Sequence, residues 1–491
     1  MSNIDMLQKY FHGGSAELEK RIRHEVFIQT RSVEEILSKI NERFIIIKSQ
    51  KGVGKSYIID ELVSASTSSG FVAIKIKPSD MDIDKIASGK IIASKIKSAY
   101  ENLVEKIALA VGCAFVKEEL PLSDAERNLY SFAVDGGHMR PELADRVLMC
   151  LTKFLPYHQK IAESYKTLSP KMFSVSVLSD DIKDALKAQD KFFWIFIDDI
   201  DLAIGRNGGI VDYEACWAII AAAFDIASNF NEVRCVVSVR NDVWHSMKRK
   251  RVGSDRRDKM TCIINVESDD QEIDAILSRR LEAASQGLDR TKRPIELFFD
   301  NRIELPGKNE ESREWRSWLC KQARNRPRDL VQLVEKLAAV AKKQNGSYIT
   351  SAHARCVLSD FARQRIENVA DELSDICGQF EFIVSRISRT YYEHRDAIDF
   401  FKKLPSAVSL NVDGSVLQPD KEESAIAILR LLHIANFMNP RVSDPTMPKG
   451  YRHIMFHEDE DLISITRKGE LSRYAFEVHP VFHSFVAENK R

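Results

Sequence analysis

The segment Gly52–Ser56 reads Gly-Val-Gly-Lys-Ser, and residue types in this order can hold the phosphates of a nucleotide. Glycines let successive backbone N–H groups curl around phosphate oxygens, the lysine reaches the β- and γ-phosphates, and the serine hydroxyl ligates Mg²⁺. The full motif begins with glycine, where this chain has Ser49. Because serine tolerates a negative φ, we expect this departure to cost little. The pattern predicts a loop that binds ATP with Mg²⁺, formed by Ser49, Gln50, Lys51, Gly52, Val53, Gly54, Lys55, Ser56 and Tyr57.

A predicted strand and a predicted helix flank this loop. Phe44–Ile47 is an apolar run that indicates a buried strand, and Tyr57–Leu62 indicates the start of a helix. The helix N-terminus adds a dipole that favours phosphate, so the motif lies in the context in which it works. The alternative is an ordinary glycine-containing turn, but the apolar strand directly before it favours nucleotide binding.

Two aspartates follow a second apolar run, Phe192–Ile197. A carboxylate at the tip of a central strand can hold the Mg²⁺ that bridges the β- and γ-phosphates, directly or through water, and Asp198 is the candidate. Asp199 occupies the position that orients or activates the attacking water, where glutamate is commoner. Its shorter side chain predicts slow hydrolysis. The alternative is a solvated acidic strand end.

Arg240 ends a third apolar strand, Val233–Val239. An arginine at this place can contact the γ-phosphate and so distinguish ATP from ADP, which makes it, with Asp199, a predicted catalytic residue. The alternative is an arginine that pairs with Asp242 or Asp199 at the strand end.

The sequence Asn-Arg-Pro-Arg-Asp precedes a further helical run, and Pro327 suits the first turn of that helix. Arg326 or Arg328 could reach the nucleotide from a lid, and Arg328 is the candidate. A helix-start loop with solvated arginines is an equal alternative.

The densest basic segment is Lys248–Arg251, followed by Arg256, Arg257 and Lys259. It could contact the nucleotide of a neighbouring subunit or the phosphates of nucleic acid. A solvated loop is at least as well supported, and the lack of interleaved aromatic residues argues against stacking on bases.

Composition excludes several classes. Basic and acidic residues number 72 each, so the formal net charge is zero and no global field favours nucleic acid or membrane. No apolar run approaches the roughly 20 residues of a membrane span, and the N-terminus lacks a secretion signal. The 8 cysteines form no C-x-x-C pair, and the histidines show no convincing metal-ligand spacing. We expect a soluble, cytoplasmic protein with reduced cysteines.

Three domains are expected in the 491 residues. Apolar strands separated by helices in residues 1–270 indicate an α/β core with a parallel sheet, interrupted by an all-α insertion at about 82–191. Ligands of such sheets bind at the carboxyl ends of the strands. Residues 271–373 are expected to form a helical lid. In residues 374–491, helices precede short strands and suggest a winged-helix-like domain; the predicted strands are 451–456, 462–465 and 474–478.

The assembled motifs resemble those of a P-loop ATPase of the AAA-like and STAND branch. The resemblance rests on Lys-Gly-Val-Gly-Lys-Ser, Phe-Ile-Asp-Asp-Ile-Asp, the strand that ends in Arg240, and Arg-Pro-Arg-Asp before the lid helix. It covers about residues 20–370 and departs at Ser49 and Asp199. It implies the strand order 5-1-4-3-2, a helical lid and a winged helix. The layout most resembles bacterial ATPases of phage-defence systems.

The resemblance implies an ATP-binding, slowly hydrolysing switch or scaffold that assembles with itself or with a separate effector protein in bacterial antiviral defence. One alternative is a DNA-handling ATPase of the initiator or transposition-helper type, which would use the winged helix and the basic segment. Another is a structural protein that keeps the fold without hydrolysis. No membrane partner is expected.

Overall fold

The computed structural model describes residues 2–13, 19, 21–39, 42–68, 72–115, 123–135, 174–189, 192–202, 211–253, 262–304, 312–447 and 449–490. These residues form two compact units, each considered by itself. The core unit comprises Thr30–Lys51 and Lys55–Val266, and the second unit comprises Met1–Gln29, Gly52–Gly54 and Glu267–Arg491.

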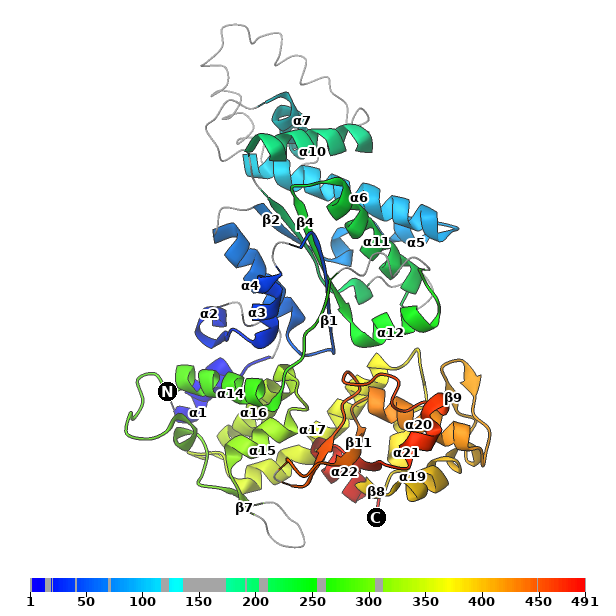
Figure 1. Ribbon diagram of the computed structural model, residues 1–491. Helices are drawn as coiled ribbons and strands as arrows, with labels where there is room; N and C mark the ends of the chain where they lie inside the picture. Colours follow the sequence, from blue (N-terminus) through cyan, green and yellow to red (C-terminus); the bar gives the residue numbers. More distant parts are fainter. Residues whose placement is uncertain are drawn as a thin grey trace. The chain divides into compact units, whose positions relative to one another are not determined.

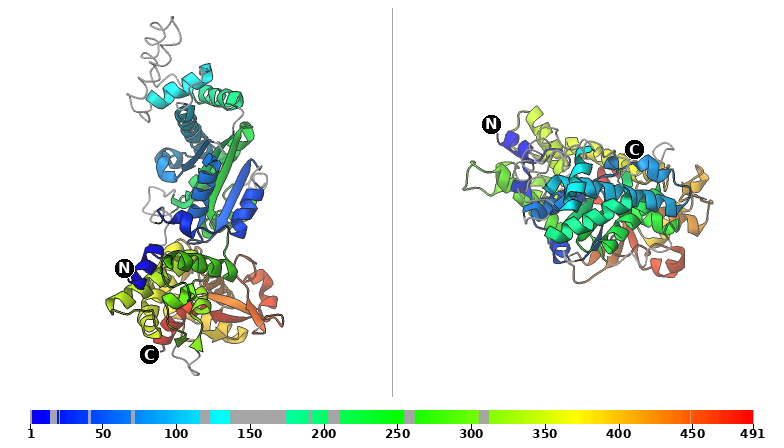
Figure 2. Two further views of the ribbon diagram at one scale, coloured as in Figure 1. Left: turned by 90° about the vertical axis from the view of Figure 1, so that its left-hand side faces the viewer. Right: turned by 90° about the horizontal axis from the view of Figure 1, so that it is seen from above.

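The core unit contains a parallel sheet with helices packed against it (Figures 1 and 2). Its five strands have the order β2-β3-β4-β1-β5. This is the predicted order 5-1-4-3-2, and it confirms the α/β P-loop fold. The central strands are mostly apolar because helices cover both faces of a parallel sheet. The strands are β1 (Phe44–Ser49), β2 (Val72–Ile76), β3 (Phe193–Ile197), β4 (Val233–Arg240) and β5 (Ile263–Asn265).

Helices cover the sheet of the core unit. α6 packs against α11, α7 and α10, so the described parts of the predicted insertion are helical and α6 contributes directly to the core. Residues 116–122, 136–173 and 190–191 of that insertion lie outside the described residues. The helices are α3 (Arg31–Ser38), α4 (Lys55–Ser68), α5 (Ile83–Ala87), α6 (Ile92–Phe115), α7 (Asp124–Asp135), α10 (Val175–Gln189), α11 (Tyr213–Asn229) and α12 (Asn241–Arg249).

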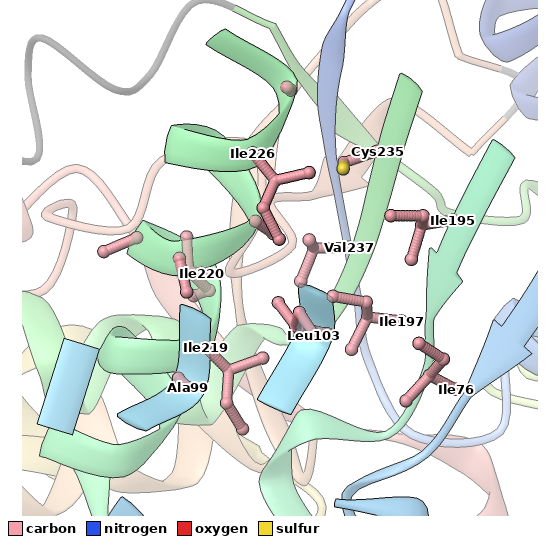
Figure 3. Close-up of a cluster of buried hydrophobic side chains, with 14 of the residues drawn as sticks. Ile76, Ala99, Leu103, Ile195, Ile197, Ile219, Ile220, Ile226, Cys235 and Val237 are labelled. Carbon is pink, nitrogen blue, oxygen red and sulfur yellow. The ribbon is translucent and has the colours of Figure 1, made fainter. Parts of the chain in front are cut away.

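Alternate residues of the strands face α6 and α11. Ile195 and Ile197 of β3 lie beside Val237 of β4, opposite Leu103 and Ile219 of the two helices (Figure 3). Each side chain is fully buried, and such burial contributes about 1.5–3 kcal/mol per residue. The residues between them on the strands face the other side of the sheet. There β2 and β3 contact α4.

In the second unit, α1 packs against α14 and α16. The buried Arg280 of α14 donates to the carbonyl of Tyr10 at 2.6 Å and to Glu19 at 2.5 Å, which fixes the N-terminal segment on this unit. Its helices up to residue 372 are α1 (Asn3–Tyr10), α2 (Arg23–Val26), α14 (Asp270–Ala284), α15 (Trp315–Gln322), α16 (Pro327–Lys343) and α17 (Ser351–Glu372), with short strands β6 (Ile303–Glu304) and β7 (Ser312–Arg313).

The C-terminal part of the second unit holds a four-stranded antiparallel sheet with the order β12-β11-β13-β8. The elements are α18 (Phe380–Ser385), β8 (Tyr391–Tyr392), α19 (His394–Phe401), β9 (Asn411–Val412), β10 (Ser415–Val416), α20 (Glu422–Ile434), β11 (Met438–Ser443), β12 (Tyr451–His453), α21 (Lys468–Leu471), β13 (Ala475–Val478) and α22 (His483–Glu488).

One strand prediction in this part is wrong, and β11 was not predicted. Residues 462–465 form no strand, because the Asp459 carboxylate accepts from the N–H of Asp461 in a turn and a 3₁₀ helix begins at Ile465. Conversely, β11, which contains Pro440, was not among the predicted strands. In the structure the carbonyl of Pro440 accepts from the N–H of Ile454, so the missing proline N–H does not prevent pairing.

Two general expectations can be compared with the described residues. Their cysteines are all free, and all but Cys113 and Cys356 are buried, so most of them lie in the core, as predicted. Within these ranges, no helix has the length and apolar character needed to cross a membrane.

Candidate nucleotide-binding site

The predicted phosphate loop joins β1 to α4. β1 ends at Ser49 and α4 begins at Lys55, so the loop lies between a central strand and a helix N-terminus, as predicted. Gly52 has φ +86° and Gly54 has φ +107°, a region that residues with a Cβ rarely adopt. The two glycines are therefore required by the backbone itself.

Ser49, the departure from the motif, is buried and has no positive φ, as expected. Its Oγ donates to the carbonyl of Gln50 at 2.9 Å. Gln50, Lys51 and Tyr57 are half-buried, and Val53 is buried. The contact of the Ser49 side chain is thus local, and replacement by glycine would remove only this hydrogen bond.

We predict that Ser49→Gly is nearly silent, with ATP affinity within about threefold of wild type, since only one neutral hydrogen bond is lost. Titration of the protein with a fluorescent ATP analogue measures this. A loss of tenfold or more would show that the hydroxyl contacts the nucleotide.

Asp198 lies directly after β3 and is fully buried. Its Oδ1 accepts from Ser238 Oγ at 2.6 Å and from the N–H of Asp199 at 3.0 Å. Within the described part of the chain Oδ2 receives no well-formed hydrogen bond, and Lys75 Nζ lies 3.0 Å from it. Burial alone would raise the pKa of Asp198, but Lys75, Ser238 and Ser56 outweigh it and lower the pKa below its usual value. Asp198 is therefore an anionic carboxylate with one oxygen oriented for a cation.

Asp199 adopts φ +54°, a left-handed conformation that aspartate tolerates better than most residues. Its N–H donates to Ser238 Oγ at 3.2 Å as well as to Asp198. Burial, with the nearby Asp198 and Asp201, raises the pKa of the Asp199 carboxyl. A carboxylate of raised pKa is a stronger base, which suits the predicted role of activating water.

Arg240 ends β4, and its Cα is paired with that of Ser49 on β1, so the structure brings it beside the start of the loop. Its guanidinium donates to both carboxylate oxygens of Asp242, at 3.1 and 2.5 Å, and to Asp201 at 3.3 Å. The pairing with Asp242 is one that the alternative interpretation of this arginine predicted, and Asp201 is a further partner. Contact with a γ-phosphate stays a prediction.

Lys55 is buried at the first position of α4. Burial lowers the pKa of its ammonium, and Asp201, Asp199 and Asp198 oppose that effect. Three carboxylates and a lysine thus share one low-dielectric region, in which each charge has a strong effect on the others.

Several residues of this region were not singled out from the sequence. Asp201 could have been found from the Asp-Asp-Ile-Asp spacing, because it follows Asp198 by three positions at the same strand end. Ser238, Lys75 and Asp60 gave no such signal. They come close to Asp198 only because β2, β3, β4 and α4 are neighbours in the folded sheet.

Arg328 lies in the first turn of α16 in the second unit, and Pro327 is the first residue of that helix, as predicted. The buried Arg324 and Arg365 both pair with Asp329, at 2.7 and 2.6 Å. Burial opposes ionisation, but the two arginines outweigh it and lower the pKa of Asp329 to about 2. This network fixes the start of α16, and the assignment of Arg328 to the nucleotide stays a prediction.

Only part of the predicted basic segment is described. Lys248 and Arg249 lie in the last turn of α12, where their positive charges interact favourably with the negative end of the helix dipole. Lys250 Nζ lies 4.2 Å from the centre of the Tyr213 ring. Arg256, Arg257 and Lys259 lie outside the described residues, so nucleic-acid contact by this segment stays a prediction.

The donors present fit Mg²⁺ brought in with phosphates. No group of three or more His, Cys, Asp or Glu side chains among the described residues is arranged to hold a metal ion by itself. Ser56 in the first turn of α4 and Oδ2 of Asp198, beside which Lys75 lies, would supply hard oxygen ligands, which Mg²⁺ prefers alongside phosphate oxygens.

Strand order, loop and helix together decide the class of fold. The fold is that of a P-loop ATPase. No family model matches the sequence, and no curated protein does. The similar solved structures include the ADP form of the Aeropyrum pernix ORC2 protein, with 9% identity, 96% of each chain covered and a TM-score of 0.38.

Two further structures are similar at the same level. A Walker-type ATPase of Pyrococcus abyssi has 12% identity and a TM-score of 0.42, covering 88% of this chain and 94% of that one. The Aeropyrum pernix ORC1 protein in complex with DNA has 11% identity and a TM-score of 0.32, covering 94% and 92%. Likeness at these TM-scores and identities adds no argument about the site, which is judged on its own geometry.

Proposed function

We propose that this protein binds ATP with Mg²⁺, hydrolyses it slowly and uses the nucleotide state as a molecular switch. The observation that carries the proposal is the arrangement of Lys55, Asp198 and Arg240 in the core unit. All three lie at the carboxyl edge of one parallel sheet, where ligands of such sheets bind.

The residues present have distinct tasks in this proposal. Lys55 and the N-terminus of α4 would bind the β- and γ-phosphates, and Ser56 and Asp198 would hold Mg²⁺, which neutralises charge on the phosphates. Asp199, whose pKa is raised by burial and by its acidic neighbours, would accept a proton from the attacking water. Because its side chain is one methylene shorter than glutamate, the proton acceptor lies further from the phosphate, and hydrolysis is slow.

Arg240 gives the switch a physical basis. Its guanidinium is held by Asp201 and Asp242. A γ-phosphate at the strand end offers a competing anion, so ATP favours release of Arg240 from Asp201 and ADP favours its retention. A ligand shifts such an equilibrium by its differential affinity for the two states.

We predict ATP-dependent assembly of the full chain with itself or with an effector protein. The molar mass by light scattering, and the proteins that copurify, are compared with ATP, with ADP and without nucleotide. ATP should increase either the molar mass or the amount of copurifying protein, and Lys55→Met should remove this increase. Identical mass and identical partners in all three conditions would contradict the switch.

The alternative function, DNA handling through the C-terminal part of the second unit, has less support than the nucleotide switch. In the part proposed to be winged-helix-like, 8 of the 13 residues of α20 are buried, and the helix begins with Glu422 and Glu423. Its Arg430 lies 3.4 Å from Asp461, so it does not offer an isolated positive charge for phosphate. Stimulation of hydrolysis by DNA would favour this second function. The role in bacterial antiviral defence is supported by the resemblance of motif order alone and stays a prediction.

A further inference from the structure

Lys75 joins three elements around the predicted metal ligand. It is the fourth residue of β2, and its ammonium Nζ lies 2.7 Å from Asp60 Oδ1 and 3.0 Å from Asp198 Oδ2. Asp60 belongs to α4 and follows Ser56 by four positions, so both lie on one face of that helix. Lys75 thus connects the helix that begins at the phosphate loop to the end of β3.

The alternation along the strands explains why this lysine meets these carboxylates. Ile74 and Ile76 of β2 and Ile197 of β3 pack in the core on the side of α6 and α11. Lys75 lies between Ile74 and Ile76, and Asp198 directly follows Ile197. Because side chains alternate along a strand, both point to the side on which α4 packs. The contact is therefore set by the fold, and it is partly shielded: the side chains of Lys75 and Asp198 are 19% and 0% exposed.

The ammonium occupies the oxygen of Asp198 that a metal ion would need. Oδ1 is engaged by Ser238 and by the N–H of Asp199. Oδ2 has the ammonium of Lys75 as its close neighbour. A divalent cation that approaches Asp198 therefore meets a fixed positive charge at the same atom.

We propose that Lys75 is a positioning residue that serves as the counter-ion of Asp198, and that a divalent cation competes with its ammonium for Asp198 Oδ2. This inference rests on the proposed binding of Mg²⁺ with nucleotide. The lysine keeps Asp198 paired when no metal is bound, and it weakens the metal site that forms with ATP. Removal of its charge should strengthen metal binding and destabilise the metal-free protein.

The test uses Mn²⁺ as the probe and the full chain saturated with the non-hydrolysable analogue AMPPNP. Free Mn²⁺ is counted by electron paramagnetic resonance for wild type and Lys75→Met. A single charge near a carboxylate changes its proton affinity by about one to three orders of magnitude, so we expect Mn²⁺ to bind about tenfold more tightly to the variant. Without metal, the variant should melt at a lower temperature than wild type. Addition of Mn²⁺ with AMPPNP should raise the melting temperature of the variant by more than that of wild type.

Two variants serve as controls. Lys95→Met removes another shielded lysine that pairs with two carboxylates, Asp212 at 3.1 Å and Glu214 at 2.9 Å. It lies in α6 and should lose stability with no change in Mn²⁺ affinity. Lys75→Arg keeps the charge and should bind Mn²⁺ within about twofold of wild type. If Lys75→Met does not fold, Lys75→Gln replaces it.

The outcomes separate this inference from the function on which it rests. Unchanged or weaker Mn²⁺ binding in the neutral variants, with normal binding of AMPPNP, overturns the role of Lys75 and leaves the proposed function intact. Failure of wild type to bind AMPPNP overturns both. Tighter Mn²⁺ binding in Lys95→Met as well would show a general effect of net charge and would also overturn the role of Lys75.

Discussion

Replacement of Lys55 by methionine is expected to weaken ATP binding by about 100-fold or more. A charge-assisted hydrogen bond contributes about 1.5–3 kcal/mol, and this ammonium is placed to make such bonds to two phosphates. The effect is enlarged by the surroundings, because Asp198, Asp199 and Asp201 then face the triphosphate without the buried positive charge that now lies among them. Titration with a fluorescent ATP analogue, followed by displacement with ATP, measures the change.

The matched control is Lys95→Met, which removes a shielded, paired lysine of the same unit at a distance in sequence from the loop. It should bind ATP like wild type. Binding by Lys55→Met within about threefold of wild type would contradict the assignment of this lysine to the phosphates and would favour the structural protein that keeps the fold without hydrolysis.

The core of the fold could be predicted because its signals are local. β1, β3 and β4 are mostly apolar runs, and a strand buried on both faces has that pattern wherever it occurs. The residues that follow such strands must meet at one edge. For this reason Lys55, Asp198 and Arg240 could be grouped before the order of the strands was known.

What could not be predicted depends on contacts across elements. No spacing in the sequence relates Lys75 to Asp198, which are neighbours only because β2 lies next to β3. The left-handed conformation of Asp199 has the same origin, since its N–H is drawn to Asp198 Oδ1 and Ser238 Oγ. Two strands of the C-terminal sheet were not predicted: β8 has only two residues, and β11 contains Pro440, a residue that is rare inside strands.

Replacement of Asp199 by asparagine is expected to lower the rate of ATP hydrolysis by about 10²- to 10⁴-fold, the usual contribution of a general base, while ATP affinity stays within about threefold. The amide keeps the size and the tolerance of a positive φ, and the N–H bonds to Asp198 and Ser238 remain. What is lost is the carboxylate whose basicity burial raises. Phosphate release, with Lys55→Met as the measure of contaminating activity, gives the rate.

Asp199→Glu tests the length argument in the opposite direction. The added methylene brings the carboxylate closer to the attacking water, so hydrolysis should be faster than in wild type. Glutamate fits φ +54° less well than aspartate, and this strain should cost about 1 kcal/mol and lower the melting temperature. Faster hydrolysis with a lower melting temperature would mean that Asp199 slows hydrolysis but stabilises the backbone turn. In that turn its N–H donates to Asp198 and Ser238. If Asp199→Asn hydrolyses like wild type, the base lies elsewhere, and Asp199 acts only through its backbone.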